Sequence, residues 1–144
     1  MFISCKYTIF PPNFVFLSHK VKELLEAGAI GEPRVLTATL CYQMEGKERI
    51  MRPELCGGAL LDLGVYVLNF ARMYFGTDIT KTVSNCHMGT TGTDMMESIS
   101  LSYTDGKMAN LQSGAVALND RQDSLVYATF PTRVLGKSSH TSII

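Results

Sequence analysis

The fold of this chain is decided by the stretch Gly57-Gly58-Ala59-Leu60-Leu61-Asp62-Leu63-Gly64-Val65-Tyr66-Val67-Leu68-Asn69-Phe70, which has the pattern of a helix buried in a larger body. A regular α-helix turns by about 100° per residue, so Asp62, Tyr66 and Asn69 fall within an arc of roughly 60°. The remaining positions are almost all apolar. A carboxylate, a phenol and an amide on such a helix must point at one another, at a neighbouring domain or into a cavity.

Two interpretations of this polar face remain open from the residues alone. In the structural one, Asp62 complements the positive helix N-terminus, and Tyr66 and Asn69 are core polar residues with partners. In the functional one, Tyr66 is an acid or base one helical turn from a carboxylate. Gly57 and Gly58 favour the second, because glycine lets the backbone come close to a ligand or to another strand.

The segment 57–66 resembles the motif G-G-x-L-x-D-x-G-x-H/Y of the glucose-fructose oxidoreductase and inositol dehydrogenase (Gfo/Idh/MocA) superfamily, in the variant that carries Tyr. That variant is similar to the dihydrodiol dehydrogenase branch, whose members oxidise trans-dihydrodiols and aldose sugars with NADP. Residues 18–33 resemble the helix and turn that lead out of the family's cofactor domain, and 47–55 resemble the loop before the motif. The resemblance runs from about residue 14 to about residue 129.

The resemblance implies roles for five residues in a dehydrogenase that uses NADP or NAD. Tyr66 would accept the substrate's hydroxyl proton, and Asp62 would orient the substrate or Tyr66. Asn69, Gly57 and Gly58 would contact a sugar or diol substrate.

The 144 residues contain neither the Gly-x-Gly-x-x-Gly of a dinucleotide-binding unit nor the family's Glu-Lys-Pro. We therefore expect an incomplete C-terminal domain, truncated at both ends, with no cofactor-binding residue of its own and inactive alone. Two alternatives are a non-catalytic binding or dimerisation module that kept the sheet, and an unrelated small α+β protein.

Composition is consistent with one globular domain over residues 1–144, because 46% of the residues are hydrophobic and 18% charged. The formal net charge of zero argues against nucleic acid or an anionic membrane as a partner. No apolar stretch is expected to reach the roughly 20 residues of a membrane span. Residues 1–7 lack the features of a secretory signal, which predicts a cytoplasmic protein.

The cysteines predict neither a metal site nor a disulfide framework. Cys5, Cys41, Cys56 and Cys86 are irregularly spaced and form no Cys-x-x-Cys pair. Cys86 and His87 are adjacent on an expected strand, where successive side chains point to opposite faces. That placement argues against joint ligation of one metal ion.

The order of elements predicts an α+β fold. We expect helices over 18–27 and 59–74 and strands over 34–44, 79–88, 98–103 and 107–118. Asp105-Gly106 predicts a hairpin between the last two strands. The fold would be an open, mainly antiparallel sheet with two helices on one face. The resemblance implies that the other face makes a homodimer and that the complete sheet has further strands after residue 118.

Overall fold

The computed structural model describes residues 19, 22–28, 32–116 and 126–129. Its strands are β1 (Val35–Cys41), β2 (Ile79–Met88), β3 (Asp94–Tyr103), β4 (Met108–Gly114) and β5 (Val126–Thr129). Its helical elements are α2 (Glu48–Met51), the 3-10 turn η1 (Pro53–Leu55), the π-helical turn η2 (Leu60–Gly64) and α3 (Val65–Phe75).

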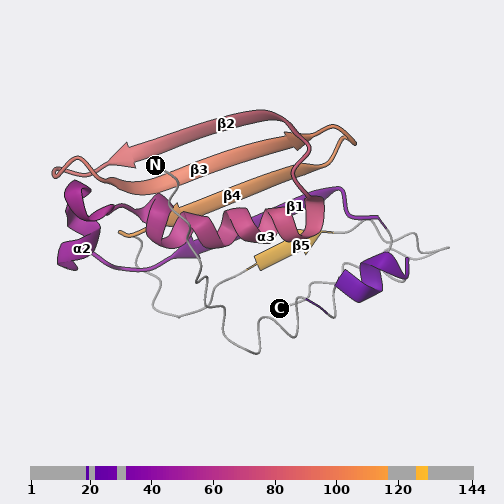
Figure 1. Cartoon of the computed structure of the whole chain (residues 1–144), viewed down its shortest axis with the longest axis horizontal. Coiled ribbons are helices and arrows are strands. Elements are labelled where there is room, and N and C mark those ends of the chain that lie inside the picture. Colours follow the sequence, from indigo (N-terminus) through magenta and orange to yellow (C-terminus); the bar gives the residue numbers. More distant parts are fainter. Residues whose placement is uncertain (1–18, 20–21, 29–31, 117–125, 130–144) are drawn as a thin grey trace.

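The strands form one sheet in the order β2-β3-β4-β1-β5 (Figure 1). Three of the four pairings are antiparallel, and β1 and β4 are parallel. The parallel pair arises because the chain crosses over through the helical layer after β1 before it builds β2, β3 and β4, and parallel strands require such a crossover. The expected α+β class with an open, mainly antiparallel sheet is confirmed.

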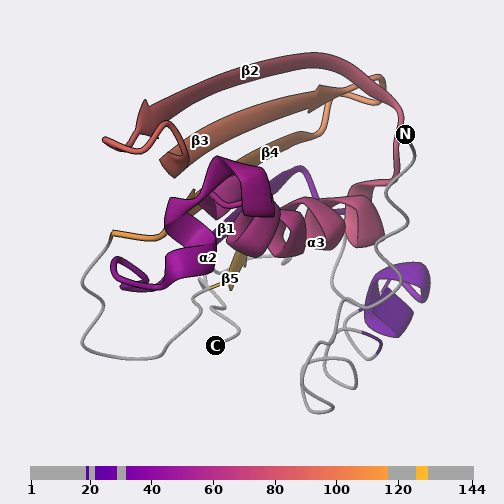
Figure 2. The same ribbon diagram turned by 60° about the vertical axis from the view of Figure 1, so that its left-hand side comes forward.

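The helical layer of η2 and α3 covers one face of this sheet (Figure 2). Strand β3 shows the resulting alternation, because its odd-numbered residues from 95 to 103 are buried and its even-numbered ones are exposed or half-buried. The main core lies between α3 and strands β1, β3 and β4. Its buried members are Leu36, Ala38, Val67, Phe70, Ala71, Phe75, Ile99, Leu101, Tyr103, Ala109 and Leu111.

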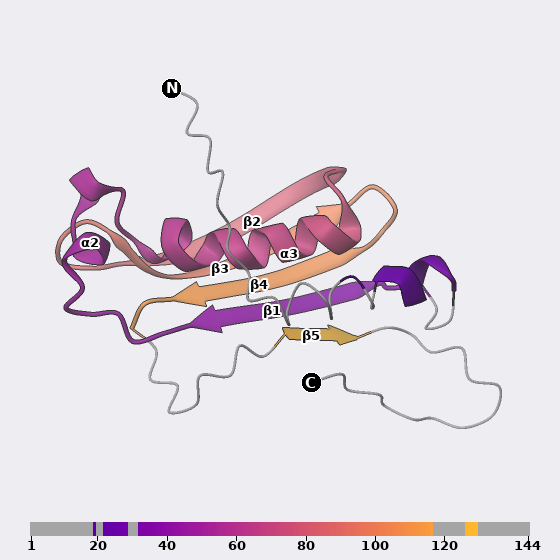
Figure 3. The ribbon, with the colours of Figure 1, turned by 60° about the horizontal axis from the view of Figure 1, so that its bottom comes forward.

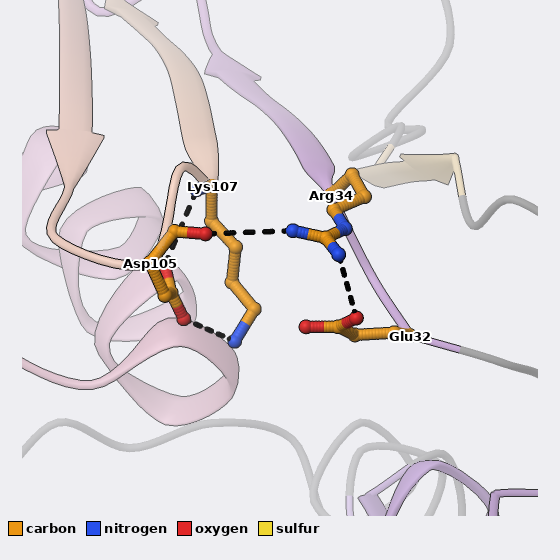
Figure 4. Close-up of polar contacts among 4 residues, drawn as sticks. All are labelled: Glu32, Arg34, Asp105 and Lys107. Atoms are coloured by element: carbon orange, nitrogen blue, oxygen red, sulfur yellow. Dashed lines mark hydrogen bonds and ion pairs between the residues drawn. The ribbon is translucent and has the colours of Figure 1, made fainter.

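The hairpin between β3 and β4 forms where Asp105 and Gly106 predict it, closed by a bond from the Tyr103 amide to the Lys107 carbonyl at 3.0 Å. Asp105 Oδ2 also accepts from Lys107 Nζ at 2.6 Å. Arg34, just before β1, reaches the Asp105 carbonyl and pairs with Glu32 (Figure 4). These exposed contacts join the hairpin turn to the start of β1 and contribute little stability each.

Of the first expected helix, the structure describes only part, in which residues 22–26 are helical. These residues lie near the start of β1 (Figure 3) and contribute no residue to the core clusters of the described chain. At the other end, β5 pairs with β1 from Val35 to Ala38, so β1 is not an edge strand along that segment. Residues 1–18 and 130–144 lie outside the described part.

One expectation about membranes needs correction. By length and composition alone, the stretch Pro53–Phe75 is long and apolar enough to cross a bilayer, whereas the sequence analysis expected no such stretch. In this fold Val67 and Phe70 pack in the main core, and Leu63 packs in a second, smaller cluster. The other buried members of that cluster are Met44, Ile50, Ala59, Met95 and Ala115.

Candidate active site

The first glycine of the pair lies against the backbone around α2. Gly57 donates its amide to the Arg52 carbonyl at 3.1 Å. A Cβ at Gly57 would stand 2.5 Å from the carbonyl oxygens of Arg49 and Ile50, closer than van der Waals contact allows. Gly57 therefore lets α2 dock against the start of the long helix. Its expected contact with substrate stays a prediction.

The second glycine lies against a carboxylate from the sheet. Gly58 is buried with φ +110°, donates its amide to the Ile50 carbonyl at 3.0 Å, and a Cβ there would overlap Asp94 Oδ1. Asp94, the first residue of β3, accepts the backbone amide of Leu60 at 2.6 Å through Oδ2. A side chain on a distant strand thus caps the helix at its first turn. The expected substrate contact of Gly58 also stays a prediction.

The docked α2 brings a cation to the polar face. Arg49 Nη2 forms an ion pair with Asp62 Oδ1. The Asp62 side chain is only 17% exposed, whereas that of Arg49 is 55% exposed. Arg49 was not among the predicted site residues, although it belongs to the 47–55 segment that carries the family resemblance. The only sequence signal was a basic residue in the loop that precedes the Gly-Gly pair.

Tyr66 and Asn69 lie on α3, and both are half-buried. The regular helical step applies inside α3 and places them on one face. Asn69 Nδ2 donates to the Val65 carbonyl at 2.7 Å, one turn earlier. Asp62 lies instead in the π-helical turn, where carbonyl-to-amide bonds span five residues, so the 100° step does not relate it to Tyr66.

The π-helical turn lies against the sheet. The Val65 amide bonds to the Leu60 carbonyl, which fits one extra residue into the turn. Gly64 lies against the sheet there, and a Cβ would stand 3.0 Å from Ser113 Oγ. Such turns are frequent at functional sites, because they re-aim side chains on an otherwise regular helix.

Behind the first turn of the helix lies a polar cluster that the sequence analysis missed. Glu97 on β3 is 8% exposed, and Ser113 on β4 donates to its Oε2. The expected strand began at residue 98, which left Glu97 outside it. The detectable signal was a carboxylate in phase with Met95, Ile99 and Leu101, the buried positions of β3.

Among the described residues, no three His, Cys, Asp or Glu side chains gather as a metal site. Cys41, Cys56 and Cys86, the cysteines within that part of the chain, are free thiols.

Comparison with known proteins identifies relatives of this arrangement. The model of the GFO/IDH/MocA C-terminal domain matches residues 18–135. A dTDP-3,4-didehydro-2,6-dideoxy-alpha-D-glucose 3-reductase of Saccharopolyspora spinosa is 36% identical over 110 residues, 72% of this chain and 33% of that protein. A trans-1,2-dihydrobenzene-1,2-diol dehydrogenase of Xenopus tropicalis is 29% identical over 114 residues, 78% of this chain and 34% of that protein.

A solved structure agrees with these matches. KijD10, a 3-ketoreductase from Actinomadura kijaniata in complex with NADP and TDP-benzene, superposes with a TM-score of 0.63 at 28% identity, over 73% of this chain and 34% of that one. This chain therefore spans about a third of the length of these relatives. The expected family is confirmed, and sugar-nucleotide ketoreductases join the dihydrodiol dehydrogenases among its relatives. The chain belongs to the GFO/IDH/MocA family of oxidoreductases, whose C-terminal domain it carries.

Proposed function

We propose that this chain is the substrate-binding part of an NAD(P)-dependent oxidoreductase that acts on CH–OH groups of sugars or trans-dihydrodiols. The observation that carries the proposal is a helical stretch with its start fixed to the sheet, which carries an ion-paired Asp62 in its first turn and half-buried Tyr66 and Asn69 in the α-helix that follows. The relatives named for dTDP-sugar reduction and for dihydrodiol oxidation support the substrate class.

In this proposal Tyr66 accepts the hydroxyl proton during oxidation and returns it during reduction. Asp62, held by Arg49, orients the substrate or Tyr66, and Asn69 hydrogen-bonds a second hydroxyl. The described residues offer no glycine-rich turn between a strand and a helix for a pyrophosphate, so we assign none of them to the nicotinamide nucleotide. The bound NADP of the relative KijD10 favours NADP for a complete enzyme.

The second candidate is a non-catalytic dimerisation module, which the open face of the sheet favours. The strand register places four exposed apolar residues on the face opposite α3, namely Val35, Val83, Met96 and Met108. A homodimer through this face is compatible with both candidates. A measurement of turnover is therefore needed to separate the two candidate functions.

The separating experiment is Tyr66→Phe in a form of the protein that includes a nucleotide-binding half. The ring and its packing remain and the proton acceptor is lost, so turnover should fall by roughly 10²–10⁴-fold. Tyr42→Phe, at an exposed tyrosine beyond β1, is the matched control and should turn over normally. Normal turnover of Tyr66→Phe would reject the catalytic role and favour the module.

The 144-residue chain itself gives a second test. In a calorimetric titration with NADP we expect no saturable binding, because the chain contains no glycine-rich pyrophosphate motif. Micromolar binding, which corresponds to about −8 kcal/mol, would show that these residues do hold the nucleotide.

A further inference from the structure

Two carboxyl groups lie side by side behind the first turn of the long helix, outside the polar face that carries the proposed catalysis. Asp94 and Glu97 both belong to β3 and interact with each other. Asp94 faces the helix start, through the Leu60 amide and the close approach at Gly58. Glu97 lies deeper, against Ser113 of β4.

The surroundings of Glu97 disfavour a charge on it. Its Oε1 is buried and meets no hydrogen-bond donor among the described residues. The adjacent Asp94 carboxylate is an acceptor, so their contact becomes a hydrogen bond only when Glu97 carries a proton. Burial first, and then Asp94, raise the pKa of Glu97 to about 7, against a lowering effect of the Ser113 hydroxyl.

The other elements around Glu97 bring no compensating cation within the described residues. From β1 the ionisable neighbour is the Cys41 thiol, whose own pKa is raised by burial and by the charge of Glu97. On β2 the residue opposite is Cys86. The helical layer contributes the backbone amide of Leu60.

The surroundings of Asp94, by contrast, favour its charged form. Burial alone would raise its pKa, but hydrogen bonds from Glu97 and from the backbone amides of Leu60, Asp94 itself and Ala59 hold it below the ordinary value. Below the pKa of Glu97 the pair therefore holds a single proton, on Glu97, and a single charge, on Asp94. This charge lies at the positive end of the helix, where it is most favourable.

We propose that Asp94 and Glu97 share one proton as a positioning pair, in which charged Asp94 fixes the helical turn that leads to Asp62 and Tyr66, and neutral Glu97 supports it. Ionisation of Glu97 places a buried negative charge against the half-buried Asp94 carboxylate and weakens the bond from the Leu60 amide to Asp94. The position of the helix start then depends on pH. The conformational effect stands without the proposed function; only its consequence for Asp62 and Tyr66 rests on it.

The experiment follows the Leu60 amide by NMR in the whole 144-residue chain, from about pH 5 to about pH 9, a range that brackets the raised pKa. The Leu60 resonance should shift with a midpoint near the pKa of Glu97, about 7. Glu97→Gln keeps the shape of the neutral group and should abolish the shift. Glu45→Gln, at an exposed carboxylate in the turn before α2, should leave it unchanged.

A second variant keeps the test decisive. Ser113→Ala removes the hydroxyl that stabilises ionised Glu97, so the midpoint should move to higher pH. A Leu60 resonance that does not change over this pH range in the unmodified chain would overturn the proposal. So would a titration that persists in Glu97→Gln. Neither result depends on catalysis, so each is distinguishable from a failure of the proposed function.

Discussion

Replacement of Gly58 by Ala is expected to be among the most damaging single-methyl changes in this domain. The backbone there has φ +110°, which L side chains rarely adopt, and forcing Ala into it costs about 1–3 kcal/mol. The new Cβ would also overlap Asp94 Oδ1. If Asp94 moves away, the 2.6 Å bond to the Leu60 amide is lost, and hydrogen bonds to charged groups contribute about 1.5–3 kcal/mol. We therefore expect a total loss of about 2.5–6 kcal/mol.

Gly46→Ala separates the cost of the backbone conformation from the cost of displacing Asp94. Gly46 has φ +91°, but no atom lies within 4 Å of the place that a Cβ would take, so only the backbone cost applies, about 1–3 kcal/mol. Urea unfolding followed by circular dichroism gives the free energy of unfolding for both variants. The difference between them measures the displacement of Asp94. If Gly58→Ala lowers the free energy of unfolding no more than Gly46→Ala does, the packing role of Gly58 is refuted. The interpretation of Gly58 as a substrate contact is then favoured.

The remaining predictions concern charge and association. Asp62→Asn, in a form that includes a nucleotide-binding half, should change substrate binding and the pH profile of turnover together, because the charge is lost and the shape is kept. An effect on the melting temperature alone would mean that Asp62 has a structural role. Arg49→Gln should lower the free energy of unfolding by less than about 1 kcal/mol in urea, because half-exposed ion pairs contribute little; a larger loss would mean that the pair anchors α2. Because the pKa of Glu97 rises from 4.5 to about 7 on folding, the free energy of unfolding should fall between these pH values by up to about 3 kcal/mol, and Glu97→Gln should flatten that slope. Light scattering should show a dimer whose stability falls in Met96→Lys on the open face, and a monomer at high concentration would contradict it.

Local signals were sufficient to predict much of this fold. Asp105-Gly106 predicts its hairpin because a short turn depends on nearby residues alone, here the three residues 104–106 between Tyr103 and Lys107. The long helix follows from its apolar pattern, although its first turn is π-helical and the 100° rule fails at Asp62. The parallel pairing of β1 with β4 could not be predicted from neighbouring residues, since it depends on the packing of the crossover between them.

The candidate site was predicted less completely, for a physical reason. Motif residues such as Tyr66 and Asp62 could be identified because they belong to one short stretch of sequence that resembles a family motif. Their supports come from elsewhere in the chain: Arg49 from the preceding turn, and Asp94 with Glu97 from a strand. Residues that meet only through tertiary packing cannot be recognised from their spacing along the sequence. The packing role of Gly57 and Gly58 is likewise visible only in the folded structure, where α2 and Asp94 lie against them.

The position of β1 between β4 and β5 has a consequence for how the domain assembles. Strands β2, β3 and β4 are joined by short connections and can pair as they leave the ribosome, with little loop-closure entropy to overcome. The pairing of Leu36 with Ala109, by contrast, joins residues on either side of the whole helical crossover. Non-local pairings of this kind slow folding. We therefore expect β1, although it is the first strand in the chain, to join the sheet after the hairpins of β2, β3 and β4 have formed.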